Sequence, residues 1–269
     1  MIFPPGKPHY KREEMDMPGK IHKKYQLVLR VALIVGIVIF FKLIAHWLGW
    51  EIISLNPLFS GIVAANVFLM GFLLTGVLSD YKESERLPGE LVASVESIVE
   101  EALMIYKSKN ASVAKECLAS LCQLTVSIKN WFYKKERTRD VMEKLSGLSD
   151  FFLAFEPLTQ ANFIVRLKQE QANIRRIMIR IHTVRETSFV SSGYLIAEIT
   201  TVLLAIGLIL VKIDPFYESL FFVGVITFLL TFLILLIRDL DNPFAYYESD
   251  STEDVSLKPL DDLIDKLTN

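Results

Sequence analysis

Four long apolar runs dominate this 269-residue sequence, arranged as two close pairs around a charged middle region. The runs are Leu27–Trp50, Leu58–Leu78, Tyr194–Val211 and Phe216–Ile237. Each is close to the roughly 20 residues that a helix needs to cross the hydrocarbon core of a bilayer. Because backbone polar groups must be satisfied inside that core, we expect four transmembrane helices and an all-α integral membrane protein surrounded by lipid.

The composition limits the classes of function that this chain can serve. Apolar residues make up 52% of the sequence and are concentrated in blocks, whereas a soluble domain spreads them along amphipathic segments. The net charge of −2 gives no basic bias, so nucleic acid is not an expected partner. Cys117 and Cys122 lack the pattern of a disulfide framework or zinc site, and we expect no metal. The polar, basic start has no apolar signal core, so we expect the first membrane helix to direct insertion.

The distribution of lysine and arginine predicts the orientation of the spans. Seven of these residues lie within 1–30 and seventeen within 82–185, against none in 51–57 and one in 212–218. By the positive-inside rule, both termini and the middle region are cytoplasmic, in a plasma or inner membrane. The chain then divides into a basic cytoplasmic segment (1–26), two membrane helices (27–79), a cytoplasmic helical region (80–190), two further membrane helices (191–238) and an acidic cytoplasmic tail (239–269).

The middle region has helical periodicity with few breakers, which predicts a helical bundle between the second and third spans. We expect one helix to open at Pro88-Gly89, followed by helices at Ser112–Tyr133, Arg139–Phe152 and Thr159–Arg185. The sequence contains no glycine-rich phosphate loop, no His/Glu metal spacing and no Ser/His/Asp arrangement. We therefore do not expect an enzyme.

The last helix of this region is strongly basic, and Arg176 and Arg180 lie four residues apart on one of its faces. The favoured interpretation is a solvated face whose charges are balanced by acids such as Glu170 and Glu186. The alternative is an inner vestibule that concentrates anions, or a surface that meets anionic lipid headgroups.

One face of the second span carries an unusual set of side chains. It begins with the small residues Gly61 and Ala65. Two phenylalanines follow, Phe68 and Phe72, and then two hydroxyl side chains, Thr75 and Ser79. Small residues allow close helix–helix packing, and periodicity alone favours that interpretation. The functional alternative is a pore face whose phenylalanines form an apolar constriction that gates by dewetting.

Three further polar positions lie inside the predicted spans. Asn66 is expected to hydrogen-bond a neighbouring helix. Lys42 is expected to extend outward to the headgroups beside the tryptophans that end the first span. Glu198 is expected to form a structural ion pair with Arg30 or Arg238, with proton sensing or ion coupling as the alternative.

Several passages resemble bestrophin-like membrane proteins. Met70–Thr75 runs into Ser79–Arg86, much as a Gly-Phe in the second span of that family leads to a Tyr, acidic and Arg run. Asn242-Pro243-Phe244 follows the fourth span, as Asn-Pro-Phe follows the last span of bestrophins. Leu257–Leu263 is similar to a proline-leucine-aspartate stretch of bacterial members. The order of elements also agrees, since two spans, a helical region, two spans and a tail follow one another.

The chain also departs from the bestrophin pattern. Leu87-Pro88 stands where bestrophins carry Trp-Trp, and Ala245 stands where a glycine follows Asn-Pro-Phe. In animal bestrophins the acidic run after Asn-Pro-Phe helps to bind calcium, and this chain has a similar run made of Glu248, Asp250, Glu253 and Asp254. Because serines and a threonine interrupt it and calcium needs several converging oxygens, we expect a solvated tail and no cofactor.

The resemblance implies an oligomeric anion channel, pentameric in bestrophins, that conducts chloride through a pore lined by the second span. It gives more weight to Phe68 and Phe72 as a hydrophobic neck and to Arg176 and Arg180 as an inner vestibule. A cation channel of the same architecture is the first alternative, because Asp80, Glu83 and Glu85 lie near the inner mouth. The second is a non-conducting scaffold or sensor that acts through its bundle. A proton-coupled transporter that uses Glu198 is disfavoured, because the sequence shows no internal repeats.

Overall fold

The structure is a computed structural model that describes residues 17–187, 191–246 and 254–268. Eight helices and two very short strands make up this described part of the chain. In chain order they are α1 (Met17–Leu48), β1 (Ile53–Ser54), α2 (Pro57–Lys109), α3 (Ser112–Phe132), α4 (Thr138–Phe155), α5 (Ala161–Glu186), α6 (Ser191–Leu210), β2 (Val211–Lys212), α7 (Phe216–Asp241) and α8 (Lys258–Thr268).

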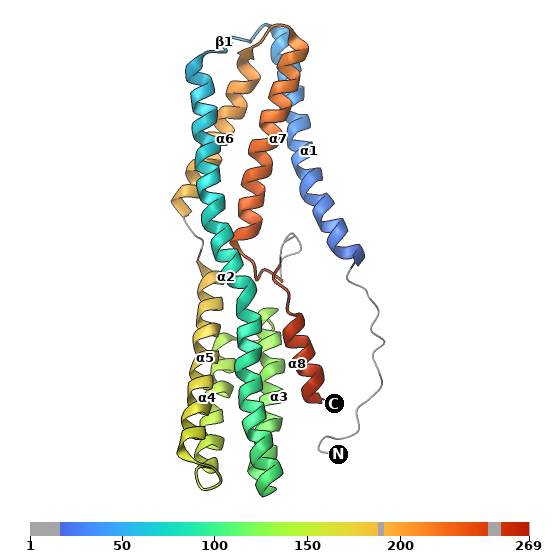
Figure 1. The fold of residues 1–269 in the computed structure, drawn as a ribbon. Coiled ribbons are helices and arrows are strands. Elements are labelled where there is room, and N and C mark those ends of the chain that lie inside the picture. Colours follow the sequence, from blue (N-terminus) through green and yellow to red (C-terminus); the bar gives the residue numbers. More distant parts are fainter. Residues whose placement is uncertain (1–16, 188–190, 247–253, 269) are drawn as a thin grey trace.

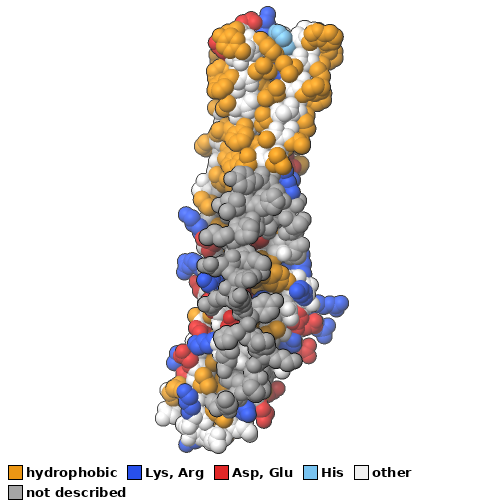
Figure 2. All heavy atoms as spheres, turned by 90° about the vertical axis from the view of Figure 1, so that its right-hand side faces the viewer, with side chains coloured by type: hydrophobic (Ala, Val, Ile, Leu, Met, Phe, Trp, Pro, Cys, Tyr) orange, Lys and Arg blue, Asp and Glu red, His pale blue; other side chains and the backbone are white. Residues whose placement is uncertain are grey.

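The helices form a long rod with two halves (Figure 1). α1, the first part of α2, α6 and α7 make the membrane half, and these four helices are long and apolar enough to cross a bilayer. The second part of α2 packs with α3, α5 and α8, and α4 packs on α3 and α5, in the other half, called the bundle below. Figure 2 shows apolar side chains over the membrane half and many charged ones over the bundle. The expected all-α membrane fold, with a bundle between the second and third spans, is confirmed.

α2 connects the two halves as one unbroken helix of 53 residues, which corresponds to about 80 Å. The prediction of a helix start at Pro88-Gly89 is wrong, because Pro88 lies inside α2. Proline cannot donate a hydrogen bond to the carbonyl of Ser84, which normally breaks or kinks a helix. Here the side chains of Leu87 and Leu91 on either side are buried in the bundle core, so tertiary packing holds the helix through the proline.

The bundle has its own hydrophobic core, separate from the contacts in the membrane half. Its largest fully buried side chains are aromatic: Trp131, Phe132, Phe152 and Phe155. The helices expected at Ser112–Tyr133, Arg139–Phe152 and Thr159–Arg185 are observed as α3, α4 and α5, with ends that differ by at most three residues. Periodic burial of apolar residues therefore identified these elements correctly.

The described part of the tail is folded onto the bundle. Phe244, from the Asn-Pro-Phe passage, is fully buried with its ring centroid 5.8 Å from that of Phe132. α8 then packs against α2 and α3 through buried Leu260, Leu263 and Leu267. Ion pairs from Lys129 to Asp261 (2.6 Å) and from Lys266 to Glu96 (2.8 Å) flank this contact.

Candidate pore face and polar pairs in the membrane half

The face of α2 identified in the sequence is exposed along its whole membrane length. Phe68 and Phe72 are 79% and 65% exposed, and Ala65, Thr75 and Ser79 are exposed as well. The other side of this part of α2 is buried against α6 and α7 through Asn66, Met70, Leu73 and Val77. In the described part of the chain, no helix packs on the stripe, and the stripe is available to lipid, to water or to another copy.

The same face continues past the membrane half into the bundle. Exposed residues recur there at helical spacing, with Glu83, Arg86, Glu90, Ala93 and Met104 on the extension of the line through Phe68 and Phe72. Arg86 and Glu90 form an ion pair on this line at 3.4 Å. α2 thus has one uncovered side in both halves, while α3, α5, α6, α7 and α8 pack on its other sides.

Arg180 of α5 lies beside this face and is paired with α2. Its Nε and Nη2 donate to the two carboxylate oxygens of Glu83 at 2.8 and 2.7 Å, and Asp80 lies 3.9 Å away. The hydrogen bonds from Arg180 lower the pKa of Glu83, although partial burial opposes this effect. Arg176 donates to Asn173 of its own helix at 3.2 Å. Acids of α2, instead of the expected Glu170 and Glu186, therefore compensate the charge of Arg180.

Two predicted polar contacts inside the membrane half are present. Asn66 accepts a hydrogen bond from Thr200 at 2.7 Å and donates one to Thr201 at 3.3 Å, so it joins α2 to α6 as expected. Glu198 of α6 forms an ion pair with Arg238 of α7 at 2.6 Å, which is one of the two partners expected for this carboxylate. A third contact was not predicted, in which the hydroxyl of Tyr194 donates to Asp241 at 2.8 Å.

Lys42 does not extend to the headgroups, and that prediction is wrong. Its side chain is fully buried, with Nζ 2.6 Å from Glu51 of the α1–α2 loop. Nζ also donates to the carbonyl oxygens of Ile209, at 3.3 Å in the last turn of α6, and of Val211 in β2. The carbonyl of Ile209 lies in the last turn of α6, where it has no partner within the helix and is negatively polarised. Together with the Val211 carbonyl and the carboxylate, it solvates the ammonium better than distant headgroups would.

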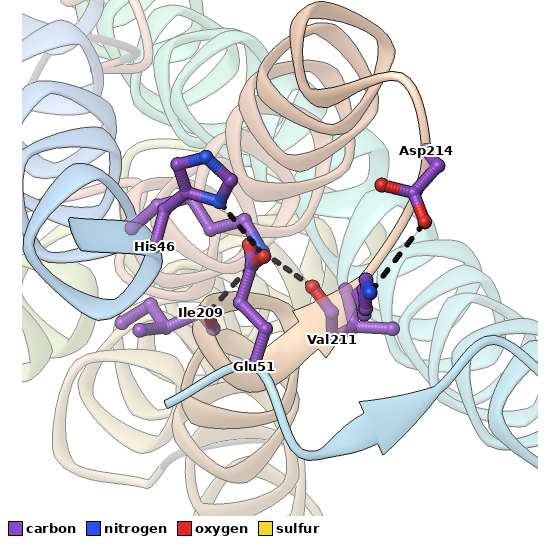
Figure 3. A network of polar contacts seen from close by, with 7 residues as sticks. His46, Glu51, Ile209, Val211 and Asp214 are labelled. Atoms are coloured by element: carbon purple, nitrogen blue, oxygen red, sulfur yellow. Dashed lines mark hydrogen bonds and ion pairs between the residues drawn. The ribbon is translucent and has the colours of Figure 1, made fainter. Parts of the chain in front are cut away.

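Glu51 is the centre of this loop-end arrangement, which we call the Lys42–Glu51 clasp (Figure 3). Its second oxygen lies 2.9 Å from Nδ1 of His46, whose ring stacks on that of Phe216 with centroids 3.7 Å apart. Burial raises the pKa of Glu51, but the hydrogen bonds and charges of Lys42 and His46 outweigh it and lower the pKa overall. Nearby, β1 and β2 pair in parallel, with Ile53 opposite Val211. The clasp therefore ties α1, the first loop and α6 together.

The structure does not test the possible calcium site of the tail. Glu248, Asp250 and Glu253 lie outside the described residues. Within the described ranges, no group of three or more His, Cys, Asp or Glu side chains is arranged to hold a metal ion. Cys117 is buried, and burial raises the pKa of its thiol to about 12, so it stays protonated at neutral pH.

Comparison with known proteins supports the fold through structure alone. Neither protein-family models nor curated protein sequences give a significant match. Crystal structures of variants of a bacterial bestrophin homologue from Klebsiella pneumoniae do match, with TM-scores of 0.73 and 0.72 at 16% sequence identity. The alignments cover 90% and 92% of this chain and 97% and 99% of those chains. The chain therefore has a bestrophin-like fold over nearly its full length.

Proposed function

We propose that this protein is an oligomeric ion channel whose pore is lined by α2 from each copy. The observation that carries the proposal is the uncovered side of α2, which runs from the membrane half into the bundle. A face that surrounds a shared aqueous axis stays uncovered in both halves.

Phe68 and Phe72 would form the neck of this pore. They are exposed on the stripe at a spacing of four residues, so symmetric copies would place them as two stacked apolar rings. Narrow apolar constrictions gate by losing their water. Oligomerisation belongs to the proposal because four spans enclose little space, and the resemblance to bestrophins suggests five copies. On the proposed topology, the bundle and both termini are cytoplasmic.

The sign of the conducted ion is the open part of this proposal. The sequence resemblance favours chloride, and Arg176 and Arg180 were its expected vestibule charges. One observation favours the alternative of a cation channel, because Glu83 and Asp80 compensate Arg180 and Glu90 compensates Arg86. The described charges beside the stripe therefore give little net attraction for anions.

Reconstitution tests both parts of the proposal. The intact oligomer is placed in liposomes or planar bilayers under a potassium chloride gradient, and the reversal potential is measured. Reversal near the chloride potential supports the anion channel, and reversal near the potassium potential supports the cation channel. If an intact oligomer carries no current when calcium and pH are varied, the channel proposal is wrong. The non-conducting scaffold or sensor is then the remaining hypothesis.

A matched pair of variants tests the neck. Phe72→Ala removes one proposed ring and is expected to raise the conductance or open probability, because a wider constriction stays wetted. Phe221→Ala is the control, since Phe221 is a phenylalanine of α7 with a similar exposure of 63%. If both variants conduct like the unmodified protein, Phe72 does not line the constriction.

A further inference from the structure

α2 lacks a backbone hydrogen bond near the level where it passes from the membrane half into the bundle (Figure 1). Pro88 lies inside the helix and has no N–H, so the carbonyl of Ser84 loses its helical donor. The turn Ser84–Pro88, called the junction turn below, is therefore held by one bond fewer than a regular helical turn. Gly89 follows it, and proline and glycine are the two poorest helix formers.

Apolar packing is also interrupted at this level. Val77 is the last residue of α2 in the buried core of the membrane half, and Leu87 is the first in the core of the bundle. Between them, in a stretch that the structure describes completely, Ser84 is the one buried residue. Tyr81 is half-buried and packs against both cores. Leu87 thus anchors the end of the junction turn, whereas its start has little apolar support.

The start of the junction turn carries polar groups that lack partners. Ser84 is fully buried, and its hydroxyl oxygen has no hydrogen-bond partner among the described residues. Its carbonyl oxygen lacks the donor that any residue other than proline would supply at position 88. Buried polar groups without partners are costly, and helices kink at prolines where water reaches such a carbonyl. A bend that opens the junction turn to water would relieve this cost.

An ion pair bridges the junction turn. Glu83 lies just before the turn, and Arg180 belongs to α5, a helix of the bundle. Arg180 donates to both carboxylate oxygens of Glu83 at 2.8 and 2.7 Å, and the two side chains are 41% and 48% exposed. A second pair between the same helices, Arg166 with Glu101 at 3.1 Å, lies beyond the proline and does not cross the turn. The Glu83–Arg180 pair therefore ties the membrane part of α2 to the bundle through a contact that water can break.

We infer that α2 bends at the junction turn and that the Glu83–Arg180 pair latches its straight form. The bundle part of α2 is the fixed arm, because its core anchors it, and the membrane part is the moving arm. In the bent form Glu83 leaves Arg180, and the carbonyl of Ser84 accepts a hydrogen bond from water. The link to gating rests on the proposed function. Phe68 and Phe72 lie on the moving arm, so a bend shifts the proposed neck relative to the bundle.

Hydrogen exchange tests the hinge without any need for conduction. The full-length oligomer is placed in heavy water, and deuterium uptake of residues 82–92 and 95–105 is followed by mass spectrometry. Uptake in 82–92 should be about tenfold faster, because this segment lacks one bond and much of the burial. Pro88→Ala restores the missing N–H and should slow uptake in 82–92 about tenfold, after correction for the added amide.

Pro57→Ala is the matched control for the hinge. Pro57 lies at the start of the same helix, where a missing N–H costs no helical bond, so uptake in 82–92 should stay unchanged. Equal uptake in 82–92 and 95–105 of the unmodified protein overturns the hinge. Equal uptake in the Pro88→Ala and Pro57→Ala proteins overturns it as well.

A second pair of variants tests the latch. Arg180→Gln removes the pair with Glu83 and should speed uptake in 82–92 about threefold, the range of a solvent-exposed ion pair. Arg175→Gln removes the same charge from α5, but Arg175 donates to Ser146 of α4, so uptake in 82–92 should not change. Equal uptake in the two variants overturns the latch.

Single-channel recording tests the link between the hinge and gating. Pro88→Ala favours the straight form and Arg180→Gln favours the bent form, so the two should shift the open probability in opposite directions. Shifts of the same sign, or no shift from either variant, overturn the link to gating. If none of the proteins carries current, the proposed channel and its gating are wrong, whereas the exchange result still decides the hinge.

Discussion

Removing the carboxylate of the Lys42–Glu51 clasp should strongly destabilise the membrane half. Glu51→Gln keeps the shape of the side chain but leaves the fully buried Lys42 ammonium with the carbonyls of Ile209 and Val211 as its remaining partners. Breaking a buried ion pair from one side costs about 3–5 kcal/mol. Because the two carbonyls still stabilise the charge, we expect the low end, about 3 kcal/mol. For a chain of this size that corresponds to a fall in melting temperature of roughly 6–12 °C.

Thermal unfolding of the purified oligomer, followed by tryptophan fluorescence in detergent, measures this change. Asp214→Asn is the control, because the 3.8 Å pair of Asp214 with Lys212 is exposed on both sides and should contribute little. Lys42→Met combined with Glu51→Gln removes both charges and should recover most of the loss. A Glu51→Gln protein that melts like the control, or a double variant that is no better than Glu51→Gln, would refute the buried-pair reasoning.

The clasp should also give stability a defined dependence on pH. The pKa of Glu51 is lowered from its ordinary value of 4.5 in the folded protein. A carboxylate with a lowered pKa contributes stability that is fully present above its ordinary pKa and is lost as the pH falls through the folded value. The difference in melting temperature between the unmodified protein and Glu51→Gln should therefore be constant at neutral pH and shrink below about pH 4.5.

Three further changes test the membrane half, the bundle and the proposed pore mouth. Asn66→Leu removes the hydrogen bonds to α6 and should cost about 1 kcal/mol, seen as a small fall in melting temperature. Phe244→Ala empties a fully buried site beside Phe132 and should cost about 3–5 kcal/mol in the same assay, and a loss below 1 kcal/mol would contradict the observed packing. Glu83→Gln leaves Arg180 less compensated, so the reversal potential should move toward that of chloride; an unchanged value would place this pair away from the ion path.

Hydropathy and periodicity predicted most of this fold because both report on side chains that avoid water, facing lipid in the spans and the hydrophobic core in the bundle. The apolar blocks identified the four spans, and the amphipathic pattern identified α3, α4 and α5. Pro88 was misjudged for a physical reason. A proline in the sequence indicates the loss of one backbone hydrogen bond, which favours a helix end. The burial of Leu87 and Leu91, which keeps the helix intact, depends on helices that are distant in sequence.

Lys42 was misjudged because its expected position was derived from its own helix. The carbonyls that bind it are supplied by the end of α6 and by β2, more than 160 residues away, and no local pattern contains them. A usable signal was present nevertheless. A cation inside a span needs a partner, and Glu51 is an acid in the adjoining loop. Pairing each intramembrane charge with the acids of neighbouring loops would have identified the clasp.

The α2 stripe marks where sequence reasoning reaches its limit. Phe68 and Phe72 look alike in the sequence whether they face lipid, a second helix or a pore, since all three surroundings accept an apolar side chain. The structure removes packing within the chain from these choices, because both rings are exposed. It also shows that the uncovered side continues to Met104, where no bilayer is available to cover it. An apolar face in the membrane that becomes a charged face in the bundle fits the proposed water-filled axis, and it equally fits lipid around the span and solvent around the bundle, so the conductance of the Phe72 variant has to decide between them.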